Sequence, residues 1–68
     1  MNINFEYYKV FYIIAKNRNI TKAANELNIT QPSISRMLKT MEEQMNTKLF
    51  IRKTKGVILT QEGQELYR

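Results

Sequence analysis

The polar side chains of residues 31–39 are those whose types and spacing are best suited to binding another molecule. If the segment is helical, successive residues rotate by about 100°, so Pro32, Arg36 and Lys39 share the outer side. Ser33 and Ser35 flank that side, and two glutamates follow only near its end. A purely solvated helix tends to carry acids first and bases last, which suits its dipole. The reversed order predicts that the first half of this helix meets phosphate and bases; an ordinary polar surface is the alternative.

A second basic group lies in residues 49–59. Two short apolar runs flank a polar stretch in which Gly56 can supply the positive φ that a hairpin turn tends to require. The hairpin would carry Lys48, Arg52, Lys53 and Lys55 and no acid. Phosphate contact is the favoured prediction, because neutralisation of the DNA phosphates by such cations supplies most non-specific affinity for DNA. The alternative is a charged edge that prevents strand-to-strand aggregation.

The composition excludes most enzyme chemistry. The 68 residues include no cysteine and no histidine, so thiolate nucleophiles, imidazole bases, disulfides and the usual zinc ligands are all absent. All six acidic residues are glutamates, and none forms a pair at an obvious catalytic spacing. We therefore predict no enzymatic activity, no metal site and no cofactor in this domain. The net charge of +5 indicates a polyanionic partner instead.

The sequence has no pattern of a membrane or targeting segment. No apolar run approaches the length needed to span a bilayer, and the first residues lack the features of a signal peptide. We therefore expect no membrane partner and a cytoplasmic location. A chain of this length makes one small domain at most.

Residues 20–39 have the pattern of two short helices joined by a tight turn. Thr21 is predicted to cap the first of them, because its hydroxyl can accept a free backbone N–H of the opening turn. Asn28 stands where a helix ends in a left-handed residue, a conformation that asparagine tolerates. Thr30 can cap the next helix, with Pro32 in its first turn, where a missing N–H costs little. These joints predict a helix-turn-helix.

A first helix is predicted from about Phe5 to Asn17, the most apolar part of the chain. Phe11 and Tyr12 are expected to share one apolar side, and further apolar residues lie on an adjoining side. A lone surface helix normally needs only one apolar stripe. The helix is therefore either buried centrally between two others or receives a helix from a partner chain on its extra apolar side.

The third helix is expected from residue 31 to about 45, with Asn46 ending it. Thr60 is predicted to cap a fourth helix, in which Gly63 indicates close packing with another segment. The sequence stops at Arg68 with this helix barely begun, which predicts that it is part of a longer protein.

Together these residues resemble the N-terminal winged helix-turn-helix domain of LysR-type transcriptional regulators over nearly the whole chain. The matching positions, in chain order, are Phe11, Asn19-Ile20-Thr21, Ala23-Ala24, Leu27, Gln31-Pro32-Ser33-Ile34-Ser35-Arg36, Met41-Glu42, Met45, Leu49-Phe50, Arg52, Gly56-Val57, Leu59-Thr60 and Gly63. Each match alone is weak, and their order along the chain makes the signal strong. The departures are mild: Asn19 replaces the usual serine, Asn46 stands where the family usually has glycine, and methionines replace two leucines.

The resemblance implies a mostly α-helical fold with a small β-hairpin, a winged helix-turn-helix with a three-helix core, a two-stranded wing and the start of a linker helix. It implies a DNA-binding domain over residues 1–59, with the helix-turn-helix at 20–39 and the wing at 49–59. Residues 60–68 would begin a linker or dimerisation helix. The resemblance further implies a homodimer or tetramer joined through that helix, and a small-molecule effector bound only by a C-terminal domain that is absent from these residues.

The implied function is sequence-specific binding of double-stranded DNA as the DNA-reading module of a bacterial LysR-type regulator. The recognition helix, residues 31–45, would lie in the major groove, and the wing on the backbone or in the minor groove. Gln31 can pair with adenine, and Arg36 can bind guanine or grip phosphate. The residues predicted at the DNA are Thr21, Thr30, Gln31, Pro32, Ser33, Ser35, Arg36, Lys39, Arg52, Lys53 and Lys55. Thr21 and Thr30 could instead be purely structural caps.

Two alternative hypotheses remain open at the level of sequence. A related winged-helix regulator, such as the molybdate-responsive type, has a similar DNA domain, and the sequence beyond Arg68 would separate the two. A winged helix could also serve as a protein-interaction module. That class typically loses the cations of the recognition helix, whereas Arg36 and the wing lysines are present.

Overall fold

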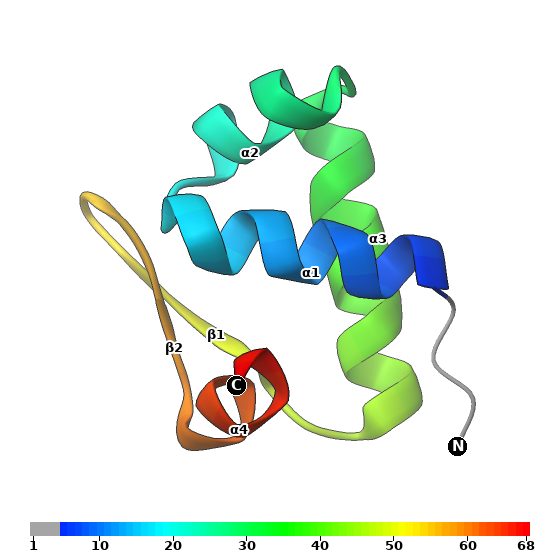
Figure 1. Cartoon of the computed structure of the whole chain (residues 1–68), viewed down its shortest axis with the longest axis vertical. Helices are drawn as coiled ribbons and strands as arrows, with labels where there is room; N and C mark the ends of the chain where they lie inside the picture. Colours follow the sequence, from blue (N-terminus) through cyan, green and yellow to red (C-terminus); the bar gives the residue numbers. More distant parts are fainter. Residues whose placement is uncertain (1–4) are drawn as a thin grey trace.

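The computed structural model describes residues 5–68, which form four helices and one two-stranded antiparallel sheet (Figure 1). In chain order the elements are α1 (Phe5–Asn17), α2 (Ile20–Leu27), α3 (Gln31–Met45), β1 (Phe50–Lys53), β2 (Gly56–Leu59) and α4 (Gln61–Tyr67). This arrangement confirms the predicted winged helix-turn-helix, in which β1 and β2 are the wing. The predicted DNA-binding domain starts at residue 1, and residues 1–4 lie outside the described part of the chain.

Helix α1 is the central element of the fold. It packs against α2, α3 and β2, and Figure 1 shows it crossing α3. The buried residues of α1 are Val10, Phe11, Ile13, Ile14 and Ala15. This burial within one chain supports the hypothesis of a helix enclosed by its neighbours. Tyr12, predicted to share an apolar side with Phe11, is 42% exposed, and its ring lies beside that of Tyr67 of α4, with centroids 5.2 Å apart.

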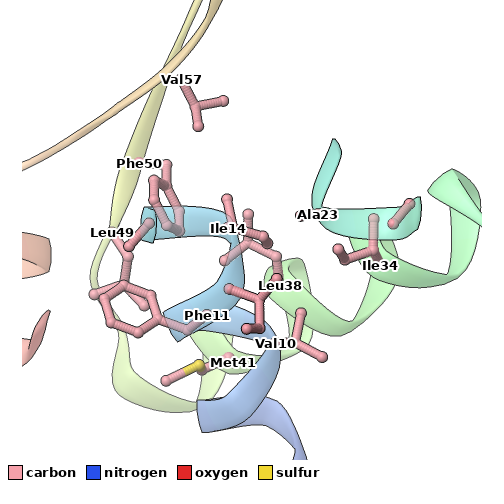
Figure 2. Close-up of a cluster of buried hydrophobic side chains, with 13 residues drawn as sticks. Val10, Phe11, Ile14, Ala23, Ile34, Leu38, Met41, Leu49, Phe50 and Val57 are labelled. Carbon is pink, nitrogen blue, oxygen red and sulfur yellow. The ribbon is translucent and has the colours of Figure 1, made fainter. Parts of the chain in front are cut away.

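One hydrophobic core joins the helices to the wing. In Figure 2 Phe11 lies beside Leu49 and Met41, and Phe50 and Val57 continue the cluster into the wing. Phe11 has no exposed surface, and the centroid of its ring lies 5.3 Å from that of Phe50. Burial of apolar surface is the main favourable term in folding. Phe11 therefore links the most apolar helix to the wing.

Polar residues begin α3 and α4, and end α2 and α3, as the sequence predicts. The Thr30 hydroxyl accepts the backbone N–H of Ser33 at 3.3 Å, which caps α3. The Thr60 hydroxyl caps α4 in the same way. Asn28 and Asn46 follow α2 and α3 in the left-handed conformation, with φ of 59° and 54°. These local contacts satisfy backbone groups that a helix end leaves free.

The prediction that Thr21 caps α2 was wrong. Asn19 is the cap, because its side-chain oxygen accepts the backbone N–H of Lys22 at 2.8 Å. Asn19 also has the extended backbone that a cap residue needs, with φ −157° and ψ 123°. Thr21 therefore lies inside the first turn of α2, and its hydroxyl is available for another contact.

Hydrogen bonds attach the wing to the helices at two places. The backbone N–H of Val57 in β2 donates to the carbonyl of Arg18, between α1 and α2, at 3.2 Å. At the start of β1, the backbone N–H groups of Leu49 and Phe50 donate to the Glu42 carboxylate of α3 at 2.8 and 3.3 Å. The wing is thus fixed with respect to both the α1–α2 junction and α3.

Both glycines occupy positions where a side chain would collide with backbone. Gly56 has a φ of 132°, which confirms the predicted positive value, and it lies against the carbonyl of Arg18. Gly63 lies against the carbonyl oxygen of Leu49 and the side chain of Leu59. The close packing predicted for Gly63 is therefore a contact between α4 and the segment that begins the wing.

Among residues 5–68, no helix combines the length and the apolar character that crossing a membrane requires.

Candidate nucleic-acid interface

The outer side of α3 carries the exposed residues Pro32, Arg36 and Lys39, as helical rotation predicts. Ser33 and Ser35 beside them are half-buried. Within residues 5–68, neither Arg36 nor Lys39 forms an ion pair with an acid. Their cationic groups therefore remain available to an anionic partner. The planar guanidinium of Arg36 also offers several N–H donors in a fixed fork, which suits base edges and phosphate.

Side chains of α2 and α3 meet at the start of α3. The Gln31 amide donates to the hydroxyl of Thr21 with 3.0 Å between Nε2 and Oγ1. The Thr30 hydroxyl donates to that of Ser33, with 3.0 Å between the oxygens. Four of the predicted residues therefore form two hydrogen-bonded pairs around one helix N-terminus. The capping role of Thr30 is observed, whereas Thr21 makes a side-chain contact in place of a cap.

The wing approaches α3 through a third pair of predicted residues. The Arg52 guanidinium donates to the Ser35 hydroxyl with 3.4 Å between Nη2 and Oγ. These two residues and Lys39 line a groove between α3 and β1. Lys53 and Lys55 are exposed further along the hairpin. The contact brings a cation of the wing to the outer side of the predicted recognition helix.

A cleft between the wing and the start of α2 collects the remaining predicted cations. It is lined by Asn19, Ile20 and Thr21 and by the hairpin residues 52–57. Figure 1 shows the tip of the wing beside the α1–α2 junction. The lining includes Arg52, Lys53 and Lys55 and no acid. Lys48, the fourth cation predicted on the wing, lies outside this cleft, near the carboxylate of Glu42. The sequence did not indicate Asn19 or Thr54 as lining residues, because only the folded hairpin brings them together.

Glu42 has a role that differs from the one its sequence position suggests. The late position of the acids on α3 predicts only that this end of the helix stays clear of the partner. The Glu42 side chain is 11% exposed, and it accepts the two backbone N–H groups at the start of β1. The ammonium of Lys48 lies 3.9 Å from its other carboxylate oxygen. Glu42 therefore attaches the start of the wing to the C-terminal half of α3.

An exposed cluster of polar side chains joins α1 to α2. The Glu26 carboxylate of α2 accepts from the Asn17 amide at 3.0 Å and from the Lys16 ammonium at 2.7 Å. The hydrogen bond from Asn17, and then that from Lys16, hold the pKa of Glu26 below its ordinary value. The same contact with Glu26 raises the pKa of Lys16. The cluster thus helps to set the position of α2, on which Thr21 lies.

No group of three or more histidine, cysteine or acidic residues within residues 5–68 could hold a metal ion. The donor groups that the structure brings together are hydroxyls, an amide, guanidinium groups and ammonium groups, which suit an anion.

Known proteins match this chain along most of its length. The model of the family described as bacterial regulatory helix-turn-helix protein, lysR family, matches residues 5–64. The HTH-type transcriptional regulator BudR of Klebsiella aerogenes is 40% identical over 65 residues, which are 96% of this chain and 46% of BudR. The chain spans less than half the length of the curated relatives BudR and AmpR.

Solved structures have the same fold. The crystal structure of Vibrio fischeri DarR in complex with DNA matches 98% of this chain and 23% of its own, with a TM-score of 0.91 and 33% identity. The BenM_DBD complex with catB site 1 DNA matches 96% of this chain and 73% of its own, with a TM-score of 0.91 and 31% identity.

Proposed function

We propose that this chain, which belongs to the lysR family of bacterial regulatory helix-turn-helix proteins, binds double-stranded DNA sequence-specifically as the DNA-reading module of a transcriptional regulator. The observation that carries the proposal is the arrangement of unpaired cations. Lys39 on α3 and Arg52, Lys53 and Lys55 on the wing line the two grooves, and Arg36 is exposed on the outer side of α3; within residues 5–68 none of these five cations forms an ion pair with an acid. DarR and BenM_DBD, which have the same fold, are each known in a complex with DNA.

The proposed mechanism divides the contacts between two elements. The major groove of B-DNA is about 12 Å wide and admits an α-helix. Helix α3 would lie there, with Gln31 and Arg36 at base edges and the neighbouring hydroxyls on phosphate. The wing, with Lys53 and Lys55, would contact phosphate or the minor groove. Phosphate contacts position the protein, and base contacts carry the sequence information.

Family membership argues against the first alternative, a regulator of the molybdate-responsive type, since the matched family is lysR. The protein-interaction hypothesis has no comparable support, because the exposed cations of α3 and the wing are retained. We further propose that the protein acts by binding in the cytoplasm, without catalysis and without a cofactor in this domain.

For the complete protein we propose a homodimer or tetramer joined through the linker helix that α4 begins. A small-molecule effector would bind a C-terminal domain outside these residues. Both proposals rest on family membership and on the greater length of the relatives.

A gel-shift assay with the complete native protein and mixed genomic fragments, at two salt concentrations, tests the proposed function. Non-specific binding depends on phosphate contacts and falls steeply with salt, so a few fragments should remain bound when most are released. Release of every fragment together at the higher salt would contradict sequence-specific binding, and no binding at low salt would contradict DNA binding altogether.

Replacing Arg36 with alanine should weaken binding to a retained fragment by about 1–3 kcal/mol, if the guanidinium makes a bidentate base contact. The exposed position of Arg36 predicts little effect on folding. Titrating the operator measures the specific affinity, and titrating a scrambled duplex measures the non-specific affinity. Arg36→Lys is the matched control, because it keeps the charge and loses the planar fork. Equal operator affinity of the wild type and Arg36→Ala would remove Arg36 from base reading.

Replacing Lys53 and Lys55 together with alanine should weaken operator and scrambled duplex alike. The slope of log affinity against log salt should become shallower by about one unit for each phosphate that the variant no longer neutralises. The control, Lys9→Ala with Arg68→Ala, removes the same charge from exposed positions outside α3 and the wing. A slope unchanged from the wild type would show that the wing lysines face solvent in the complex.

A further inference from the structure

The contact between Gln31 and Thr21 joins the first residue of α3 to the first turn of α2. Their side chains lie 3.0 Å apart at Nε2 and Oγ1, and both residues are exposed. An exposed glutamine normally samples many rotamers, and holding it costs side-chain entropy. The hydrogen bond therefore restricts a side chain that the proposed function places at a base edge.

This hydrogen bond uses one specific part of the glutamine amide. The amide has two N–H donors and a carbonyl acceptor, and the contact with Thr21 engages one N–H. One N–H and the carbonyl oxygen remain for a partner. In the major groove adenine presents the N6 donor and the N7 acceptor, whereas guanine presents two acceptors, N7 and O6. The remaining pair on Gln31 complements adenine and places its oxygen against O6 of guanine.

The hydroxyl of Thr21 can accept or donate, so a second partner decides which end of the amide faces the base. Thr21 lines the cleft that also contains Arg52, Lys53 and Lys55, where a phosphate would be attracted. A phosphate oxygen that accepts the Thr21 hydroxyl hydrogen leaves Oγ1 only as an acceptor. The Gln31 amide must then present its N–H to Thr21, and hydrogen bonds linked in this way strengthen one another.

We propose that Thr21 is a positioning residue for base recognition: it orients the Gln31 amide toward adenine and links that orientation to a phosphate contact in the wing cleft. The proposal rests on the proposed DNA-binding function. It assigns to Thr21 an effect on specificity at one base pair, beyond a general contribution to affinity.

Selection from a random-sequence duplex library with the complete native protein tests the proposal. The wild type should select a motif with adenine at one position that Gln31→Ala no longer selects. Thr21→Val keeps the shape and removes the hydroxyl, and it should reduce the adenine preference at that position about fivefold, as expected for one hydrogen bond. Thr21→Ser keeps the hydroxyl and should select adenine at that position as strongly as the wild type does. Thr47→Val, which removes a hydroxyl beyond the C-terminal end of α3, should select the wild-type motif.

Each other outcome has a definite meaning. If Thr21→Val weakens all sequences equally and keeps the adenine preference, Thr21 contacts phosphate only and the proposal is overturned. A Thr21→Val motif identical to the wild type in strength and sequence also overturns it, as does a base other than adenine at the Gln31-dependent position. A wild-type protein that selects no motif would instead contradict the proposed function.

Discussion

Replacing Phe11 with alanine is expected to lower the free energy of unfolding by about 3–5 kcal/mol, the range for a large aromatic removed from a core. Phe11 is fully buried, and its ring lies against those of Tyr8, Phe50 and Tyr67, with centroids 6.0, 5.3 and 6.4 Å away. The cavity would therefore open between α1, the wing and α4 at once. Urea unfolding followed by circular dichroism measures the loss.

The total stability of a domain this small is about 3–10 kcal/mol, at roughly 0.05–0.15 kcal/mol per residue. Phe11→Ala should therefore leave a large fraction of molecules unfolded at moderate temperature. Phe5→Ala is the matched control, because it makes the same change in the same helix at a side chain that is 79% exposed. Similar losses in the two variants would show that Phe11 does not connect the elements as described.

The second large effect is expected at Gly63, where alanine should destabilise the fold by about 3 kcal/mol, at the upper end for overpacking. The new Cβ would meet the carbonyl oxygen of Leu49, which already accepts the backbone N–H of Thr60 at 3.0 Å. A backbone carbonyl cannot turn aside as a flexible side chain can. Helix α4 would have to move away from the start of the wing, which thermal unfolding would detect.

Gln64→Ala provides the comparison for Gly63→Ala, since Gln64 is the next residue of α4 and is exposed. In a helix interior alanine is favoured over glycine by about 1 kcal/mol, so an uncrowded position 63 would gain stability from the substitution. An unchanged or raised melting temperature for Gly63→Ala would therefore contradict the close approach of α4 to Leu49.

The helix ends could be predicted from the sequence because their interactions are local. Thr30 and Thr60 each bond to a backbone N–H three residues later, and Asn28 and Asn46 adopt the left-handed conformation that asparagine tolerates. The error at Thr21 arose because Asn19 is an equally suitable cap two positions earlier. The left-handed backbone of Arg18, which a sequence pattern does not reveal, precedes the residue that becomes the cap.

The contacts that assemble the candidate interface could not be predicted in the same way. Arg52 bonds to Ser35 across 17 positions, and Glu42 bonds to the backbone at the start of β1. Such hydrogen bonds depend on tertiary placement and leave no periodic signal in the sequence. The residue types of the interface could be chosen from charge and helical rotation, and their roles at DNA stay predictions until the variants are measured.

The two attachments of the wing, at Arg18 and at Glu42, have a consequence for the thermodynamics of recognition. The hairpin loses its backbone freedom when the chain folds, so little ordering entropy is left to lose when it meets a duplex. The distance between α3 and the wing then stays nearly constant when the protein binds DNA. A duplex whose groove widths do not match this distance must deform to bind. The energy of that deformation depends on the sequence of the duplex. Base pairs that no side chain touches would in this way still affect which sites are bound.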